Sequence, residues 1–437
     1  MKQKVTLFWF RRDLRLEDNC GFSKALQGKH KVLPIFIFDN DILEECSPDD
    51  SRVTFIHQSI AALKTQLMAL GSDLIVRHGK PIQVFEALQK SYDLQHIITN
   101  RDYEPYALVR DLEIGQFCST HQMGFYQFKD QVICETDQIV KADGTPYVVY
   151  TPYSKKWLEY ILSASALQAY DHKPYTDNLL KIDAEDLMAL EDMGFVPGPH
   201  PVLPYDLSDY TIQHYSSTRN FPAKTNGTSK LSPHLRFGTV SVRHAARLAV
   251  KQSDVTFLKE LIWREFFMQI LWHFPHTVTQ AFKPAYDRIE WRNNQTEFDL
   301  WTKGQTGYPM VDAGMRELNE TGYMHNRVRM VVASFLCKHL LIDWRWGESY
   351  FAKKLLDFEL SSNIGNWQWA AGTGVDAAPY FRIFNPTTQI DRFDAAHKYL
   401  DQWVPERLTE HYPEPIVDHK TARERCLLAY KKALDRL

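Results

Sequence analysis

The chain of 437 residues lacks the features that mark several common classes of protein. Its six cysteines are scattered, without a CxxC pair or a cysteine–histidine grouping, which argues against a disulfide framework and a zinc site. No apolar run approaches the roughly 18 residues of a membrane span. The opening residues, MKQKVTLFWFRRDLRL, do not have the layout of a signal peptide, because arginines follow a short apolar run at once. We therefore expect a cytoplasmic protein with free thiols and no bound metal.

Charge of one sign is also not in large excess, since the net charge is -3. Its distribution is uneven, however. Residues 1–210 carry 21 basic and 30 acidic side chains, and residues 211–400 carry 23 basic and 17 acidic ones. Binding of a polyanion requires only a local basic surface, which the second half can supply. On charge alone, an accidental asymmetry between two domains is the simpler interpretation.

The order of apolar runs predicts two domains of different class. In the first domain short apolar strands alternate with helical patterns, which is typical of a parallel sheet covered by helices. The first strand is followed by RRDLRLEDN and not by a glycine-rich turn, so a dinucleotide-binding fingerprint is absent. The expected strands are 4–10, 31–38, 73–79, 95–100 and 125–134, and the expected helices are 51–71 and 81–93.

The second domain has helical spacing throughout. Apolar residues recur at intervals of three and four in the stretches 257–274, 307–322, 324–343 and 347–362. A proline-rich passage, GFVPGPHPVLPYD, precedes them and does not fit regular structure. The predicted architecture is an α/β domain over 1–135 with a Rossmann-like parallel sheet, a linker over 136–210, and an all-helical domain over 211–437.

Tryptophans gather in the helical half, where eight of the eleven lie between residues 263 and 369. Core filling explains any single one. Together they suggest a second role, because indoles stack on flat ligands and a chain of them can pass an electron. In GNWQWAAGTG, Trp367 and Trp369 are two positions apart and point about 200° apart on a helix, which predicts that they serve two surfaces.

Polar side chains on otherwise apolar helices mark a candidate ligand site. They are Arg327, Arg329, Asp357, Glu359 and Asn363. Buried polar groups are paired or grip a ligand, so an interhelical salt bridge between Arg329 and Asp357 and a polar cofactor edge both fit the pattern.

Two further stretches are ambiguous in the same way. Glu260 and Trp263 share a helical face, which suits either a base edge in a cavity or a solvated surface. The segment TNGTSKLSPHL places hydroxyls before a helix, as a phosphate site or a plain capping box does.

Longer motifs resemble the photolyase/cryptochrome family, and most of all class I cyclobutane pyrimidine dimer photolyases. They are WFRRDLRLEDN, ELIWREFF, GYPMVDAGMRELNETGYMHNRVRMVVASF, LLIDWRWGESYF and NWQWAAGTGVDAAPYFRIFNPTTQ, which together extend over both domains. The resemblance implies an N-terminal antenna domain and a C-terminal helical domain that binds FAD in a U shape. It also implies DNA as the partner, a monomer without an obligate protein partner, and no membrane.

The family's activity is light-driven repair. One electron passes from photoexcited, fully reduced anionic FAD to a flipped-out cyclobutane pyrimidine dimer and returns after the ring has split. By resemblance, the residues that bind FAD are Tyr215, Thr228, Ser229, Lys230, Leu231, Ser232, Glu260, Arg264, Asn326, Arg329, Asp357, Glu359 and Asn363. Asn363 matches the position beside the flavin N5, where plant-type cryptochromes carry an acid.

The resemblance implies four further roles, some of which share residues. An electron relay runs through Trp367, Trp344 and Trp291. The dimer pocket is formed by Trp263, Trp369, Glu260, Asn326 and Met330, in which the two indoles clamp the unstacked bases. Glu260, Asn326, Met330 and Asn363 are the implied catalytic residues. The DNA backbone is held by Arg219, Arg327 and Arg382.

An antenna chromophore is implied less specifically. Asp102 and Glu104, in NRDYEPYALVRD, match the acids of deazaflavin-type sites. An FMN-like flavin fits the same slot, and an empty slot is a further alternative. Ala107 stands where folate-type members carry glutamate, which disfavours folate. Other departures from the family pattern are Glu359 for aspartate, Tyr323 and Phe257 for tryptophan, and Ile364 and Asn366 before Trp367.

Four alternatives remain. A (6-4) photolyase carries histidines where this chain has Asn326 and Met330, and cryptochromes of the DASH kind usually carry glutamine at position 330. A signalling cryptochrome without repair activity often has a long C-terminal extension. A flavoprotein that uses the fold for another reaction is the last alternative.

Overall fold

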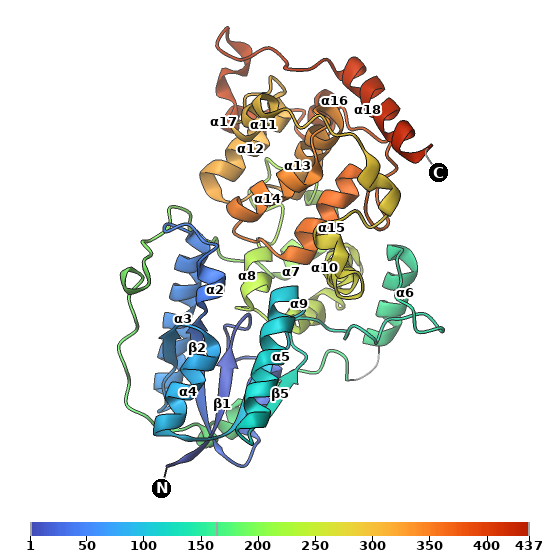
Figure 1. Ribbon diagram of the computed structural model, residues 1–437. Coiled ribbons are helices and arrows are strands. Elements are labelled where there is room, and N and C mark those ends of the chain that lie inside the picture. The colour runs from blue at the N-terminus through green and yellow to red at the C-terminus, as the bar shows by residue number, and fades with distance from the viewer. Residues whose placement is uncertain (1, 163–164, 436–437) are drawn as a thin grey trace. The chain divides into compact units, whose positions relative to one another are not determined.

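A computed structural model describes residues 2–162 and 165–435 (Figure 1). The chain divides into two compact units. The sheet unit comprises residues 1–138, 157–205 and 231–251, and the helical unit comprises residues 139–156, 206–230 and 252–437. Among the described residues, no helix is both long and apolar enough to cross a bilayer.

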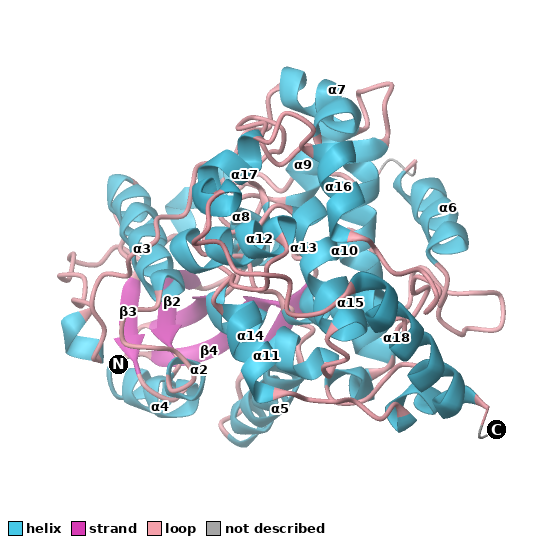
Figure 2. Cartoon of the chain, turned by 90° about the horizontal axis from the view of Figure 1, so that it is seen from above, coloured by secondary structure: helices cyan, strands magenta, loops and turns pink. Residues whose placement is uncertain are grey.

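The sheet unit is built on five parallel strands in the order β3-β2-β1-β4-β5, drawn in magenta in Figure 2. Their bounds are β1 Lys4–Phe10, β2 Lys31–Phe38, β3 Ile75–His78, β4 Asp93–Asn100 and β5 Gly124–Phe128. All five match predicted strands, although the last ends at Phe128 and not at residue 134. The strand order reverses between β1 and β4, the kind of position at which parallel sheets bind ligands beyond their carboxyl ends.

Alternate residues of β1 form two cores, because successive side chains of a strand point to opposite faces. Phe8 and Phe10 pack with α1 (Cys20–Leu26) and α3 (Ser51–Ala69) on one face. Leu7 and Trp9 pack with α4 (Pro81–Ser91) and α5 (Pro105–Thr120) on the other. The continuous apolar runs of the strands are therefore the signature of a sheet covered on both faces.

The helical unit has its core around the fully buried side chains of Trp301, Trp344 and Trp367. The helices that matter for the site are α7 (Asp209–Thr218), α10 (Thr256–His273), α12 (Pro309–Thr321), α13 (Asn326–Ser334), α14 (Trp344–Lys354) and α15 (Leu360–Ala371). A π-helical turn, Phe335–His339, continues α13. The remaining helices of this unit include α11 (Gln295–Thr302), α16 (Pro386–Phe393), α17 (Lys398–Trp403) and α18 (His419–Leu434).

Two boundaries in the structure differ from those expected. The compact units do not follow the division 1–135, 136–210 and 211–437, because residues 231–251 belong to the sheet unit and residues 139–156 to the helical unit. The reason is long-range pairing: Phe237 joins the core of the sheet unit, and Arg243 forms ion pairs with Asp18 and Asp130. The stretch 347–362 is also not one helix, since α14 ends at Lys354 and α15 begins at Leu360.

Candidate functional site

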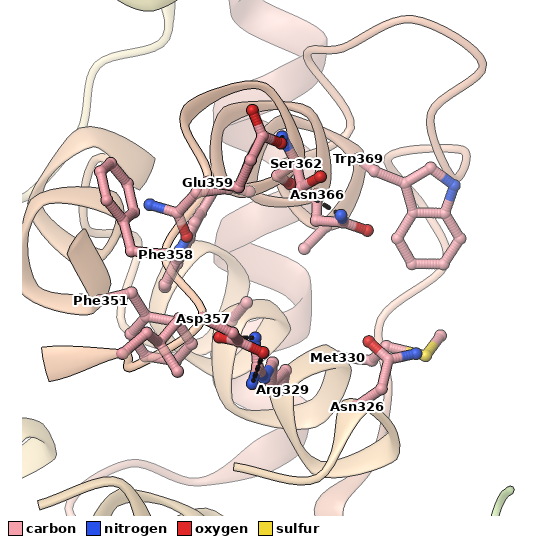
Figure 3. A pocket seen from close by; sticks show the side chains of 15 residues that line it. Asn326, Arg329, Met330, Phe351, Asp357, Phe358, Glu359, Ser362, Asn366 and Trp369 are labelled. Carbon is pink, nitrogen blue, oxygen red and sulfur yellow. Dashed lines mark hydrogen bonds and ion pairs between the residues drawn. The ribbon is translucent and has the colours of Figure 1, made fainter. Parts of the chain in front are cut away.

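An open cavity of about 600 Å³ lies in the helical unit (Figure 3). It is bounded by α13, α14, α15 and the connection between the last two helices. Its walls combine apolar rings with amides, acids and a guanidinium, the combination that a flat ligand with polar edges requires. The lining residues are Asn326, Arg329, Met330, Ala333, Phe351, Leu355, Asp357, Phe358, Glu359, Ser362, Asn363, Asn366, Trp367, Trp369 and Ala370.

Arg329 and Asp357 form a two-pronged ion pair in the cavity wall (Figure 3). The Nη1 and Nη2 atoms of Arg329 donate to the two carboxylate oxygens of Asp357 at 3.2 and 2.9 Å, and Nε donates to the carbonyl of Met324 at 2.7 Å. The salt bridge and the cofactor edge were both open interpretations of this pair. The structure shows that the pair is formed and that both partners line the cavity.

Glu359 connects the cavity to the start of α15. Its carboxylate accepts hydrogen bonds from the backbone N–H groups of Ser361 and Ser362, and from the Ser361 hydroxyl at 2.7 Å. It is thus the N-cap of α15, a role that stabilises a helix by roughly 0.5–2 kcal/mol. The break before α15 follows from this capping, which periodicity alone did not reveal.

The side-chain amide of Asn363 is oriented by Glu348. Its Nδ2 donates to the Glu348 carbonyl at 3.1 Å and to Oε1 of the same residue at 2.8 Å. Burial raises the pKa of the Glu348 carboxyl. With its amide nitrogen held there, Asn363 has its Oδ1 left to accept a hydrogen bond from a ligand in the cavity. The sequence analysis missed Glu348, because a partner 15 residues away carries no local signal.

The two tryptophans of GNWQWAAGTG differ in environment. Trp367 is buried, and its ring packs edge-on against Phe351 at 4.9 Å and Trp301 at 6.2 Å. Trp369 is half-buried and lies with Asn326 and Met330 at one side of the cavity, while Phe351 and Phe358 lie at the opposite side (Figure 3). One indole therefore belongs to the core and the other to the open part of the cavity.

Glu260 and Trp263, on α10, do not line this cavity in the described part of the chain. Glu260 forms an ion pair with Arg219. The ring of Trp263 stacks on Tyr150, with centroids 3.7 Å apart and an angle of 1° between the planes. Neither partner was predicted, since both come from segments distant in sequence.

Arg219 belongs to a group of four arginines in the helical unit, which we call the arginine cluster: Arg219, Arg327, Arg382 and Arg392. Burial lowers the pKa of the Arg327 guanidinium, and the positive charges of the other three lower it further. Within the described residues of this unit, Arg219–Glu260 is the one ion pair that involves the cluster. Such an excess of positive charge suits a phosphate backbone. Arg392 was missed by the sequence analysis.

The segment expected to hold the FAD phosphates is divided between the units. Tyr215, Thr228, Ser229 and Lys230 lie in the helical unit, and Leu231 and Ser232 lie in the sheet unit. Lys230 adopts a left-handed backbone conformation with φ 53° and places its Nζ 4.1 Å from the ring centre of Tyr323. None of these residues lines the cavity described above, and the same holds for Arg264.

His325 provides a test of whether a polar cofactor fits this region. It is buried, and its Nδ1 accepts the backbone N–H of Arg327, so the ring hydrogen is on Nε2. Nε2 is buried and has no acceptor among the described residues. Burial and the charges of Lys230 and Arg329 hold the imidazole neutral, with its pKa lowered to about 3. A neutral N–H donor among cations fits a ligand that carries acceptor or anionic groups.

The remaining predicted residues have the following positions. Trp344 is fully buried at the start of α14, and Trp291 is half-buried and packs edge-on against Tyr430 at 6.1 Å. In the sheet unit, Asp102 pairs with Arg12 at 3.1 Å, and Glu104 pairs with Arg12 and Arg236 at 2.8 and 2.9 Å.

Comparison with known proteins decides the family. The model described as DNA photolyase matches residues 6–173, and the model described as FAD binding domain of DNA photolyase matches residues 257–409. The deoxyribodipyrimidine photo-lyase of Halobacterium salinarum is 37% identical over an alignment of 481 positions, gaps included. The alignment covers 98% of this chain and 99% of that protein. The chain belongs to the DNA photolyase family.

Further photolyases agree over the full length. The deoxyribodipyrimidine photo-lyase of Escherichia coli is 32% identical over 98% of both chains. The structure of a class III photolyase from Agrobacterium tumefaciens matches with a TM-score of 0.87 at 33% identity. The match covers 100% of this chain and 98% of that chain. A cryptochrome from Synechocystis also shares the fold, with a TM-score of 0.86 at 26% identity over 98% of this chain and 99% of that chain.

Proposed function

We propose that the protein repairs cyclobutane pyrimidine dimers in DNA, as a deoxyribodipyrimidine photo-lyase driven by light. The observation that carries this proposal is the cavity of the helical unit, in which the Arg329–Asp357 pair and the amide of Asn363 face apolar rings. Relatives with the name deoxyribodipyrimidine photo-lyase match 98% of the chain, which supports the same activity here.

FAD fits the residues of this region. We propose that Arg329, Asp357 and Asn363 hold the polar edge of its ring system and that Phe351 and Trp367 form apolar walls. Thr228, Ser229 and Lys230 are proposed to hold its phosphates. When bound in its reduced form, the flavin supplies an electron that light makes available to the substrate. The protein's own work is to position the substrate, to exclude water and to set the polarity around it.

The dimer is proposed to enter beside Trp369, Asn326 and Met330, with Glu260 and Trp263 completing its pocket. Extrusion of a lesion costs a few kcal/mol, less than for a normal base, and aromatic stacking worth about 1–3 kcal/mol per base offsets much of it. Asn326 and Met330 stand where a (6-4) photolyase carries histidines, which favours the cyclobutane lesion. A cryptochrome without repair activity is the alternative, and the Synechocystis neighbour carries the name cryptochrome.

The relay of Trp367, Trp344 and Trp291 stays a proposal that burial supports. The first two indoles are buried and the third is half-buried, as a series that leads from the cavity toward solvent requires. We propose that it returns electrons to the flavin when the cofactor has become oxidised.

A second chromophore is proposed at the carboxyl ends of β1 and β4 in the sheet unit. A photolyase from Sulfolobus tokodaii contains two FAD molecules and is 33% identical to this chain, with a TM-score of 0.83 over 98% of this chain and 100% of that chain. In this chain the buried Nε1 of Trp9 and Nη2 of Arg110 have no acceptor among the described residues. These donors support a flavin-like ligand, whereas Asp102 and Glu104 are engaged with arginines.

We also propose that the protein acts in the cytoplasm as a monomer. Cys20, Cys46, Cys118, Cys337 and Cys426 are free thiols, as a reducing compartment allows. One chain supplies both the cavity and the arginine cluster.

The decisive experiment uses the FAD-loaded full chain, photoreduced, with an oligonucleotide that contains one cis-syn thymine dimer. We expect the dimer to disappear under near-ultraviolet or blue light and to persist in the dark, as measured by chromatography of the products. Trp369→Phe should weaken dimer binding. Trp346→Phe is the matched control, because Trp346 packs on Phe298 outside the cavity. If illuminated protein with reduced FAD leaves the amount of dimer unchanged, repair is rejected in favour of signalling.

A further inference from the structure

The ion pair between Arg219 and Glu260 joins two groups that the proposed function assigns to the substrate. Arg219 is the C-cap residue of α7, and its Nη1 donates to Oε1 of Glu260 on α10. The side chains are 25% and 32% exposed, so the pair is accessible to a ligand. The guanidinium also lies over the ring of Tyr215, 5.5 Å from its centre. In the protein without DNA, the guanidinium of Arg219 and the carboxylate of Glu260 are therefore paired with each other.

Only one of these two groups has an alternative partner of opposite charge in a complex with DNA. A backbone phosphate brought to the arginine cluster competes with Glu260 for the guanidinium, and phosphate is a strong two-pronged acceptor for arginine. Among the described residues, by contrast, Arg219 is the one cation that pairs with Glu260. Burial raises the pKa values of the Tyr150 and Tyr215 phenols, and the charge of Glu260 raises them further, so both phenols stay neutral.

We propose that the Arg219–Glu260 pair is a latch that the DNA backbone opens: a phosphate takes the guanidinium of Arg219, and Glu260 then takes one proton from solvent and donates a hydrogen bond to the flipped-out dimer. Arg219 is thus a positioning residue that acts through Glu260. This inference rests on the proposed repair function and adds to it the order of events, since the backbone is engaged before the carboxyl meets the lesion.

The electrostatics of the site agree with the direction of this change. Burial raises the pKa of the Glu260 carboxyl, while the charge of Arg219 and its hydrogen bond lower it. Removal of the guanidinium leaves the burial effect unopposed and favours the protonated form. A neutral carboxyl donates a hydrogen bond, whereas a carboxylate only accepts. A donor is the useful partner for a pyrimidine carbonyl oxygen on which negative charge develops.

The latch predicts opposite effects of Arg219→Gln on two probes. Binding of a dimer-containing oligonucleotide should weaken, because a phosphate contact is lost. Binding of a cyclobutane dimer of 1-methylthymine, which has no phosphate, should become about threefold tighter or more, because Glu260 no longer has to leave Arg219. Affinities are measured by fluorescence titration of the FAD-loaded protein.

Arg392→Gln is the matched control, because Arg392 belongs to the arginine cluster and forms no ion pair with an acid among the described residues. It should weaken oligonucleotide binding and leave the affinity for the phosphate-free dimer unchanged. Infrared difference spectra give an independent readout. A protonated-carboxyl band that Glu260→Gln abolishes should appear in the wild type when the oligonucleotide binds, and should already be present in free Arg219→Gln.

The outcomes separate the latch from the proposed function. If wild-type protein neither binds nor repairs the dimer, repair itself is wrong. If it does both, and Arg219→Gln binds the phosphate-free dimer no more tightly than the wild type, Arg219 is a plain phosphate contact and the latch is refuted. Weaker binding of both probes, without the carboxyl band in the free variant, assigns Arg219 a structural role and also refutes it.

Discussion

The side-chain amide of Asn363 is proposed to set the charge beside the flavin. Its nitrogen is held by Glu348 at 2.8 Å, and its oxygen is the neutral acceptor offered to the cavity. Asn363→Asp places a carboxylate opposite Glu348 and adds negative charge beside the flavin. We expect the midpoint potential of the flavin to fall by on the order of 60 mV, the equivalent of a tenfold change in a one-electron equilibrium. A spectroscopic redox titration measures it.

The double variant Asn363→Asp, Glu348→Gln isolates the charge that faces the flavin, because the repulsion between the two carboxylates is then absent. The fall in potential should persist in the double variant. An unchanged potential in both variants would show that Asn363 does not contact the redox-active part of the flavin.

At the scale of elements, α14 and α15 approach each other at a glycine. A Cβ on Gly347 would lie 2.2 Å from Cη2 of Trp367 and 2.6 Å from Leu336, closer than packed atoms allow. Gly347→Ala should therefore displace the Trp367 indole and lower the free energy of unfolding by about 1–3 kcal/mol, as overpacking of a core does. Denaturant titration measures the loss, and the rate of flavin photoreduction reports the displaced indole.

Gly115→Ala is the control for a glycine-to-alanine change within a helix. A Cβ on Gly115 would meet Phe125 at 3.7 Å, an ordinary contact, so alanine should stabilise α5 by up to about 1 kcal/mol. Equal stability and photoreduction in the wild type and Gly347→Ala would mean that α14 and α15 yield without moving Trp367.

Elements with a strong local signal were predictable from the sequence. The runs that became β1 and β2 are buried on both faces, and so their apolar residues are nearly continuous. The end of α14 was not predictable, since it depends on Glu359 capping α15 and on Asp357 reaching Arg329. The capping contact is local but leaves no mark in the apolar spacing, and the ion pair joins residues 28 positions apart, so periodicity encodes neither of them.

The same limit applies to the site. Arg329, Asp357 and Asn363 were identifiable as polar residues on apolar helices, and the cavity brings them together. The pairing of Arg219 with Glu260 and the stacking of Tyr150 on Trp263 were not identifiable, because the partners lie far apart in sequence. A resemblance to a family transfers residue roles, but not the contacts that this chain makes before its substrate arrives.

On the scale of the whole molecule, a net charge of -3 does not favour DNA, so binding must come from a local field. We propose that the arginine cluster supplies that field, and the salt dependence of DNA binding measures it. Each phosphate neutralised on duplex DNA changes the slope of log K against log salt by about -0.9. We expect a slope of about -3 to -4 for the four arginines, and Arg392→Gln should reduce its magnitude by about 1 while the preference for the lesion is retained.

Lys432→Gln is the control for this slope, because the charge of Lys432 is exposed and already paired with Glu290 at 2.6 Å. Removing it should leave the slope unchanged, as filter binding over a series of salt concentrations will show. A wild-type slope between zero and about -1 would mean that at most one phosphate is neutralised, since a contact that releases no counterions adds nothing to the salt dependence. The cluster would then not face the DNA backbone, and neutral contacts in the cavity would have to supply the affinity.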